Sequence, residues 1–306
     1  MKYIQPLKML MVTAAIATPL CLIVSVPAFA AKPVKETVCN VGSPPYLSIL
    51  SAVADTNCDS INVPAGTYYE HVTIGSTSPP TARNVTIRGA GPGSTIVDGG
   101  NSGSVFIVHN STVTLKGMTI TNGLATGPYP NGGGIGSAFS TLTVKDCLIT
   151  GNHAPGLTGK PGRGGGLHSV YGTLIVKDST ITNNSAASGG GINGGASPNV
   201  ITVMDSVIAD NEATEQGGGI ISITSGTVPG AVTVKDTTIT RNDAGKEGGG
   251  IYVTNTTLTV KDSTITDNAA NQVGDSYQGG GIYLANSTLT VKDSTITGNT
   301  PNNIYP

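Results

Sequence analysis

The sequence contains no tryptophan and only three phenylalanines, and charged residues occupy 11% of its positions, against about 25% in an ordinary domain. This shortage of large rings argues against a globular core built around aromatic side chains. The formal net charge of -2 provides no concentrated positive charge, so we expect no binding to nucleic acid. Isoleucine, valine, leucine and threonine are abundant and regularly placed, which argues against a disordered chain.

Long apolar runs are also scarce, and the one present lies near the start, at residues 9–27. Residues 1–8 carry two lysines and no acid, and residues 28–30 read Ala-Phe-Ala. This order is typical of a secretory signal peptide, and its alternative is a membrane anchor. Because prolines interrupt the run and a cleavage site follows it, we expect a signal peptide at 1–30. The mature chain is then secreted or on the cell surface, with no transmembrane segment.

Cysteine is rare, with four residues in the whole chain, and one of them leaves with the signal peptide. An oxidising compartment permits Cys39 and Cys58, both near the new N-terminus, to form a disulfide. Cys147 stands alone at a position that is serine or threonine in related segments. We therefore expect Cys147 to be a small, buried core residue with a free thiol.

An internal repeat dominates the remaining chain. The segment Thr-Leu-Thr-Val-Lys-Asp-Cys-Leu-Ile-Thr-Gly-Asn at 141–152 has copies at 173–184, 200–211, 231–242, 257–268 and 288–299, and a weaker copy at 112–123. After most copies a polar loop leads to Gly-Gly-Gly-Ile or Gly-Gly-Gly-Leu, at 132–135, 164–167, 189–192, 217–220, 248–251 and 279–282. Such self-similarity indicates a stacked repeat architecture.

Each repeat unit can be interpreted as one coil of a β-helix. Side chains in a strand alternate, so Leu142 and Val144 face the same way. A corner at 145–146 returns the alternating residues of 147–149 to the same interior, and a second corner falls at 151–152. The third strand is built around the glycine triplet and the following isoleucine. Three short strands with a loop of variable length account for the unequal repeat steps.

Stacking such coils places equivalent residues in ladders. We expect the ladder of corner asparagines to be structural, because asparagine tolerates the left-handed conformation of a sharp corner and bonds along the stack. These residues are Asn152, Asn184, Asn211, Asn242, Asn268 and Asn299. The glycine triplets supply special backbone angles and close approach between walls. Adjacent lysine and aspartate ladders neutralise each other. We expect no cofactor. Calcium bound by the aspartate ladder is the open alternative, and it is disfavoured because calcium needs six or more oxygen ligands.

The N-terminal region resembles the start of pectin-lyase-like β-helix proteins, through Leu47–Ala54, Asp59–Glu70 and Val72–Ile74. In that superfamily a short helix caps the open end and the first coil follows. The Gly-Gly-Gly-Ile and Ile-x-x-Asn blocks are similar to repeats of polymorphic outer membrane proteins and other bacterial surface proteins. This chain departs from the outer membrane repeat in its third glycine, which replaces alanine, and in its isoleucine, which replaces phenylalanine. Together the resemblances cover roughly residues 47–299.

Repeat and resemblance together predict an all-β chain. Its fold is a right-handed, single-stranded parallel β-helix with three short strands per coil and a short N-terminal capping helix. The expected organisation is a signal peptide at 1–30, an N-terminal cap with the short helix at 31–58, and the parallel β-helix at 59–306.

The resemblance also implies a connection with acidic polysaccharides, which many proteins of this superfamily cleave. A hydrolase needs paired carboxylates, and a lyase needs a charge sink beside a base. The Gly-His-Gly and Asn-Thr-Asp motifs of polygalacturonases and the Trp-Ile-Asp-His stretch of pectate lyases do not occur here. Most acids outside the repeat pattern sit singly in turns or loops, and they are Glu70, Asp98, Glu212, Glu215, Glu247 and Asp275.

We therefore expect a secreted or cell-surface scaffold that binds an extracellular or cell-wall polysaccharide without turnover, with the polysaccharide or the cell envelope as its partner. Two alternatives stay open. One is a polysaccharide lyase or glycoside hydrolase acting on acidic polysaccharide, and the other is a purely structural envelope protein.

The candidate ligand site lies where the loops are longest. Leu124–Asn131 and His153–Arg163 are long loops in consecutive coils, so they should leave the same corner on neighbouring layers. A third long loop, Ala269–Gln278, lies several coils away. An aromatic ring, an imidazole and two cations suit an acidic sugar. The alternative is that the two loops are surface insertions that the fold tolerates and that bind nothing. The expected patch consists of Tyr129, His153, Lys160 and Arg163.

Overall fold

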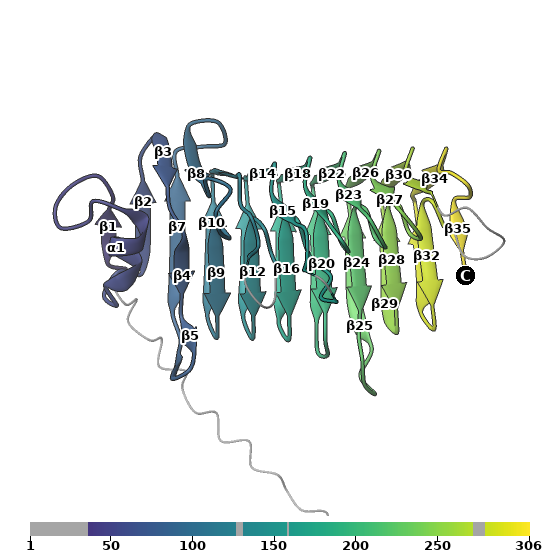
Figure 1. Cartoon of the computed structure of the whole chain (residues 1–306), viewed down its shortest axis with the longest axis horizontal. Coiled ribbons are helices and arrows are strands. Elements are labelled where there is room, and N and C mark those ends of the chain that lie inside the picture. Colours follow the sequence, from purple (N-terminus) through teal and green to yellow (C-terminus); the bar gives the residue numbers. More distant parts are fainter. Residues whose placement is uncertain (1–35, 127–130, 158, 272–278) are drawn as a thin grey trace, which may run out of the picture. The chain divides into compact units, whose positions relative to one another are not determined.

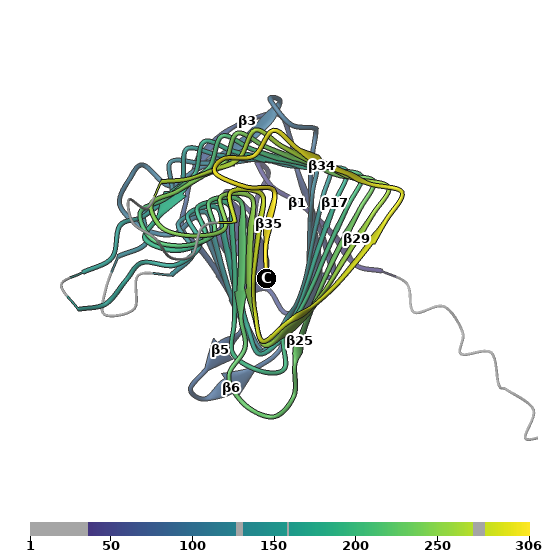
Figure 2. The same cartoon turned by 90° about the vertical axis from the view of Figure 1, so that its right-hand side faces the viewer.

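A computed structural model describes residues 36–126, 131–157, 159–271 and 279–306 of the chain. The expected signal peptide at 1–30 lies outside these residues. Figure 1 shows parallel strands stacked coil upon coil, and the end-on view of Figure 2 shows the walls that surround the interior. The expected parallel β-helix is therefore confirmed. No helix among the described residues is long and apolar enough to cross a membrane.

Three long sheets form the walls, and we call them sheets I, II and III. In the described residues sheet I has ten strands: β1 (Val38–Asn40), β2 (Ser60–Val63), β7 (Asn84–Gly89), β10 (Thr112–Lys116), β13 (Thr141–Lys145), β17 (Thr173–Lys177), β21 (Val200–Met204), β25 (Gly230–Lys235), β29 (Thr256–Lys261) and β33 (Thr288–Lys292). Sheet II has nine: β3 (Gly66–Tyr69), β8 (Thr95–Asp98), β11 (Thr119–Thr121), β14 (Leu148–Thr150), β18 (Thr180–Thr182), β22 (Val207–Ala209), β26 (Thr238–Thr240), β30 (Thr264–Thr266) and β34 (Thr295–Thr297).

Sheet III also has nine strands in the described part of the chain: β4 (Val72–Ile74), β9 (Phe106–His109), β12 (Ile135–Ala138), β16 (Leu167–Val170), β20 (Ile192–Gly195), β24 (Ile220–Ile223), β28 (Ile251–Thr254), β32 (Ile282–Ala285) and β35 (Ile304–Tyr305). A short antiparallel hairpin, β5 (Ser76–Thr77) with β6 (Pro80–Thr81), projects from the stack.

A fourth sheet of two-residue strands, sheet IV, was not expected from the sequence. Its strands within the described residues are β15 (His153–Ala154), β19 (Ser185–Ala186), β23 (Glu212–Ala213), β27 (Asp243–Ala244) and β31 (Ala269–Ala270). It follows the asparagine corner, in the segment expected to be loop. Two residues are too few to show an alternating pattern, so only stacking on the neighbouring coils reveals these strands.

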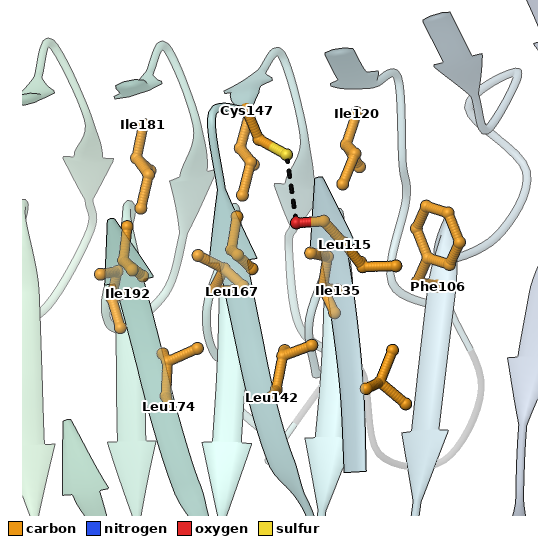
Figure 3. Packing of buried hydrophobic residues seen from close by; sticks show 14 of the residues in the cluster. Phe106, Leu115, Ile120, Ile135, Leu142, Cys147, Leu167, Leu174, Ile181 and Ile192 are labelled. Atoms are coloured by element: carbon orange, nitrogen blue, oxygen red, sulfur yellow. Dashed lines mark hydrogen bonds between the residues drawn. The ribbon is translucent and has the colours of Figure 1, made fainter. Parts of the chain in front are cut away.

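The interior matches the expected alternation. Leu142 and Val144 are fully buried, and Cys147 and Ile149 lie on the same inner side after the corner. Figure 3 shows Leu142, Cys147 and Leu167 pointing into this shared interior, with the Cys147 thiol directed at the Leu115 carbonyl oxygen, 3.6 Å away. Cys147 is a free, buried cysteine as expected, and burial raises the pKa of its thiol to about 11. The thiol is thus kept in its unreactive, protonated form.

The asparagine ladder is structural, but the asparagines do not themselves adopt the left-handed conformation that we expected. The left-handed residue at this corner is not the asparagine but its predecessor, as at Gly151 (φ 65°) and Asp210 (φ 56°). That residue turns the chain so that the following asparagine side chain points inward. Asn211, for example, is 1% exposed. The expected bonding along the stack is confirmed, because each amide donates to the next one at 2.9–3.0 Å from Asn152 to Asn268.

The lysine and aspartate ladders pair as expected. Each aspartate that follows the sheet I strands lies within 4.0 Å of a lysine, the closest pair being Lys235 and Asp236 at 2.6 Å. Each exposed pair contributes at most about 1 kcal/mol, so the ladders balance charge more than they stabilise the fold. These carboxylates already have cationic partners, and the described residues contain no cluster of three or more histidine, cysteine or acidic side chains that could hold a metal ion.

The N-terminal end is closed by the expected helix, α1 (Ile49–Ala54). Ser48 caps it through a reciprocal capping box, and the Glu70 carboxylate accepts hydrogen bonds from the backbone of Ile49 and Leu50, both at 2.9 Å. The buried face of α1 packs on β2 and β4. Glu70 is therefore an anchor for the cap, because a carboxylate is stabilising at a helix N-terminus.

The expected Cys39–Cys58 disulfide is present, with a Cα–Cα distance of 5.7 Å. It ties β1 to the segment after α1, across a sequence separation of 19 residues. Replacing both cysteines by serine should lower the free energy of unfolding by about 3 kcal/mol, because the unfolded chain regains the entropy of the open loop. Urea unfolding of the purified protein measures the loss. An unchanged midpoint and slope would show that the bridge adds nothing to the cap.

Candidate functional site

The structure places the four expected patch residues in different settings. Tyr129 lies outside the described residues. His153 belongs to β15 rather than to the loop, and its Nδ1 lies 2.6 Å from Ser185 Oγ on the next coil. Lys160 forms a bridge with Leu157 inside the loop, and Arg163 precedes the glycine triplet of its coil. His153 starts the longer loop and Arg163 ends it, so these two residues stand at opposite ends of one segment, and the four-residue patch stays a prediction.

The two long loops do leave adjoining layers, as expected. Their starting residues Leu124 and His153 form a parallel bridge, and so do their ends, Asn131 and Arg163. Both loops end directly before the glycine triplets that lead into sheet III. Arg163 stands at the edge of this sheet and bridges onward to Ser188. The loop pair thus delivers Arg163 to the outer face of sheet III.

That outer face carries two rows of residues in register. The first row runs through Thr73, Ile107, Gly136, His168, Asn193, Ile221, Tyr252, Tyr283 and Tyr305. The second runs through His109, Ala138, Val170, Gly195, Ile223, Thr254 and Ala285. Small residues at Gly136, Ala138 and Gly195 leave the middle of this face hollow. Towards the C-terminus large side chains cover this face again, and the rings of Tyr252 and Tyr283 stack there with centroids 4.9 Å apart.

Two adjoining hollows occupy the middle of sheet III, and together we call them the sheet III trough. One, of about 260 Å³, is lined by Ile107, His109, Asn131, Gly136, Ser137, Ala138, His168 and Val170. The other, of about 340 Å³, is lined by Pro161, Arg163, Ser188, Asn193, Gly194, Gly195, Ala196, Glu215, Gln216, Ile221, Ile223 and Ser225. His168 lines the first hollow and Asn193 the second, and these two residues belong to neighbouring strands and hydrogen-bond to each other.

His168 and Asn193 form the polar floor of the trough. His168 Nδ1 lies 3.1 Å from Asn193 Oδ1, and the ring is buried at 5% exposure. Burial, helped by the nearby positive charge of Arg163, lowers the pKa of His168 to about 4. The ring is therefore neutral near pH 7. With Nδ1–H donating to Asn193, its other nitrogen, Nε2, is an unprotonated acceptor.

This buried histidine makes stability depend on pH. The unfolded chain binds a proton as the pH falls through about 6.5, whereas folded His168 does so only at about 4. Its contribution is therefore complete above pH 6.5 and is lost as the pH falls towards 4, on the order of 3 kcal/mol. Urea unfolding of wild type and His168→Asn at pH 7.5 and 4.5 measures this loss. His109, whose pKa burial also lowers, contributes equally to both proteins. Identical acid sensitivity would contradict the assignment.

The other polar groups of the trough are mostly uncharged. His109 Nδ1 is buried and forms no hydrogen bond with another described residue. Among the described lining residues Glu215 is the one carboxylate, and its Oε1 lies 3.5 Å from Lys246 Nζ. Arg163 is exposed and supplies the positive charge. The arrangement can therefore hold a polyhydroxylated ligand by hydrogen bonds and one anionic group by Arg163.

Two of the other acids singled out in the sequence have structural partners. Glu70 holds α1, and the Asp98 carboxylate accepts hydrogen bonds from Gly100 N and Asn122 Nδ2. Asp275 lies outside the described residues. Sequence reasoning missed the floor residues because the four histidines look scattered. Aligning the glycine triplets would have revealed them, since His168 and Asn193 both stand two residues after a triplet.

Comparison with known proteins identifies the fold. A family model described as a right-handed β-helix region matches residues 70–258. No curated protein matches the chain. A mutant pectin methylesterase in complex with a hexasaccharide is 11% identical, with a TM-score of 0.45 over 89% of this chain and 94% of that chain. The A-module of mannuronan C-5 epimerase AlgE4 from Azotobacter vinelandii is 14% identical, with a TM-score of 0.46 over 81% of this chain and 71% of that chain.

A surface adhesin of Streptococcus pneumoniae, PfbA, also matches, at 12% identity and a TM-score of 0.24 over 83% of this chain and 87% of that chain. At these identities and TM-scores the matches carry no argument about activity. A fold by itself does not determine function, so the function has to be inferred from the side chains of this chain.

Proposed function

Because the chain belongs to the right-handed β-helix family, we propose that it is a secreted or cell-surface scaffold that binds an extracellular polysaccharide in the sheet III trough without turning it over. The observation that carries this proposal is the trough itself. It extends from Ile107 to Ile221 across five successive strands, or about 19 Å at the usual strand spacing. Two neighbouring hollows spread over this length suit an extended polymer better than a single small molecule.

The lining of the trough suits a carbohydrate. Ile107, Val170 and Ile223 offer apolar surface to the C–H faces of sugar rings, while amides and hydroxyls along the same floor can pair with sugar hydroxyls. A mostly apolar pocket with a few fixed polar groups is the usual composition of a ligand site. Arg163 can form a charge-assisted, bidentate hydrogen bond with a carboxylate or sulfate. Lys160 and His153, on the adjoining loop and corner, extend the proposed contact beyond the trough.

Binding without turnover is favoured over hydrolysis by the arrangement of carboxylates. Glycoside hydrolysis requires two carboxyl groups on either side of the scissile bond. The described lining residues supply Glu215, which is paired with Lys246, and no second acid. We therefore propose that the trough retains its ligand intact.

The test is a panel of acidic polysaccharides scored for both retention and turnover. We expect the mature protein to be retained by at least one of them, and Arg163→Ala to bind about tenfold more weakly, because one charge-assisted hydrogen bond is lost. Arg241→Ala is the matched control, since Arg241 is also exposed but pairs with Asp210 at a different corner. New reducing ends or unsaturated sugars would contradict binding without turnover. Equal affinity of the two variants would contradict the placement in the trough.

A further inference from the structure

Two aromatic residues lie at a strained corner beyond the trough. Phe139 and Tyr171 follow β12 and β16, and both adopt left-handed backbone conformations, with φ of 54° and 53°. Their rings stack, with centroids 4.8 Å apart and planes 2° from parallel. Yet both are exposed, at 54% and 44%. A bulky residue in this conformation is a genuine outlier, because its side chain crowds the backbone.

The fold has a less strained solution for this corner and uses it elsewhere. Asn110, Asn255 and Asn286 occupy the equivalent position in other coils, with φ of 49°, 49° and 46°. Asparagine enters the left-handed region easily. The stack therefore does not need aromatic residues here. Strain kept at exposed positions in two consecutive coils points to a function rather than to packing.

A hollow of about 240 Å³ lies beside the aromatic pair. It is lined by Asn110, Ser111, Thr112, Phe139, Ser140, Thr141, Tyr171, Gly172 and Thr173. None of these residues is charged, and hydroxyls and an amide alternate with the aromatic surface. The Tyr171 hydroxyl forms no hydrogen bond with another described side chain or backbone group. The hollow lies past the ends of the sheet III strands, where sheet I begins, so it is distinct from the trough.

We propose that Phe139 and Tyr171 form a second glycan site, which binds a neutral sugar residue. The C–H face of a pyranose ring packs on the exposed aromatic surface, and its hydroxyls pair with the Ser, Thr and Asn side chains around the hollow. An anionic sugar finds no cation in this lining. The site rests on the proposed function in one respect, that the ligand is again a glycan, but it uses none of the side chains of the trough.

The experiment uses the variant Phe139→Asn/Tyr171→Asn, which installs the residue that equivalent corners already carry. Affinity electrophoresis of the full mature chain is run in gels containing a soluble neutral glucan, mannan or galactan. Wild type should be retarded by at least one, and the double variant should bind it at least roughly tenfold more weakly. The midpoint of thermal unfolding should stay unchanged or rise, because strain is relieved. Phe139→Tyr, which keeps the ring, should retain binding.

Arg163→Ala separates the two sites, since it should leave retardation by the neutral polymer unchanged. If acidic polymers fail to bind but neutral ones bind through the aromatic pair, the trough proposal fails and this one stands. Three results overturn the inference: no neutral polymer retards the wild type, the double variant is retarded as strongly as wild type, or its unfolding midpoint falls. The last would show that the pair serves the fold.

Discussion

Replacing Asn211 by alanine is expected to lower the free energy of unfolding by about 4 kcal/mol. Asn211 Nδ2 donates to the carbonyl oxygens of Ile181 and Ala209, both at 3.0 Å, and to Asn242 Oδ1 at 2.9 Å. Its Oδ1 accepts from the backbone and side-chain nitrogens of Asn184. Alanine removes these side-chain hydrogen bonds to three coils at once. Asn242 Oδ1 still accepts from the backbone nitrogen of residue 211, but each buried group that loses its partner carries a desolvation penalty.

Urea unfolding of Asn211→Ala measures the loss, and Asn62→Ala is its control. Asn62 also bonds along the stack, with Nδ2 donating to Asn40 Oδ1 at 3.1 Å, but this contact is exposed. Water replaces an exposed partner, so the control should lose less than about 1 kcal/mol. Equal losses in both variants would show that the buried ladder has no special role. Lost ligand binding with an unchanged midpoint would instead make the ladder a binding site.

Replacing Gly165 by alanine should cost about 3 kcal/mol or more, because the new methyl group has no room. A β-carbon there would lie 2.5 Å from Ser185 O and 2.6 Å from both Gly190 O and Ser185 N. All three are backbone atoms of the next coil, so none can rotate away. Relief requires that two coils separate, which weakens the hydrogen bonds between them.

Gly195→Ala is the matched control, since Gly195 also lies in a coil of sheet III with ordinary backbone angles. Its β-carbon would come no closer than 3.5 Å, to Val170 Cγ1, an ordinary contact. Thermal unfolding of the two variants should therefore differ by many degrees, with Gly195→Ala close to wild type. If both alanines are tolerated, close approach between walls does not explain the second glycine of each triplet.

The wall structure of this protein could be predicted from sequence because its signals are periodic. Alternation places Leu142 and Val144 inward. Two residues separate Val144 from Cys147, so Cys147 faces the same interior only if the chain turns a corner between them. We expected the left-handed conformation at the corner asparagine, but the residue before it adopts this conformation. Both asparagine and its predecessor are turn formers in several coils, and only the buried amide shows which of them turns.

The trough could not be predicted in the same way, because it forms where side chains on the outer face of sheet III are small or, at glycine, absent. Gly136 and Gly195 leave space only relative to bulky neighbours in the same row, such as Ile107 and Tyr252. That row becomes visible only when coils of unequal length are brought into register. The length of the loops predicts Arg163 as part of a ligand patch, and the structure places it at the edge of sheet III. His153 is held in a strand that the sequence pattern did not reveal.

The most direct test of polysaccharide binding in the trough is a crystal structure of the purified protein with an oligosaccharide from the polymer that retains it. The account predicts an intact oligosaccharide lying along the sheet III trough over His168 and Asn193, with its anionic group within hydrogen-bond distance of Arg163. An oligosaccharide bound only to another wall of the stack, or one found cleaved, would contradict it.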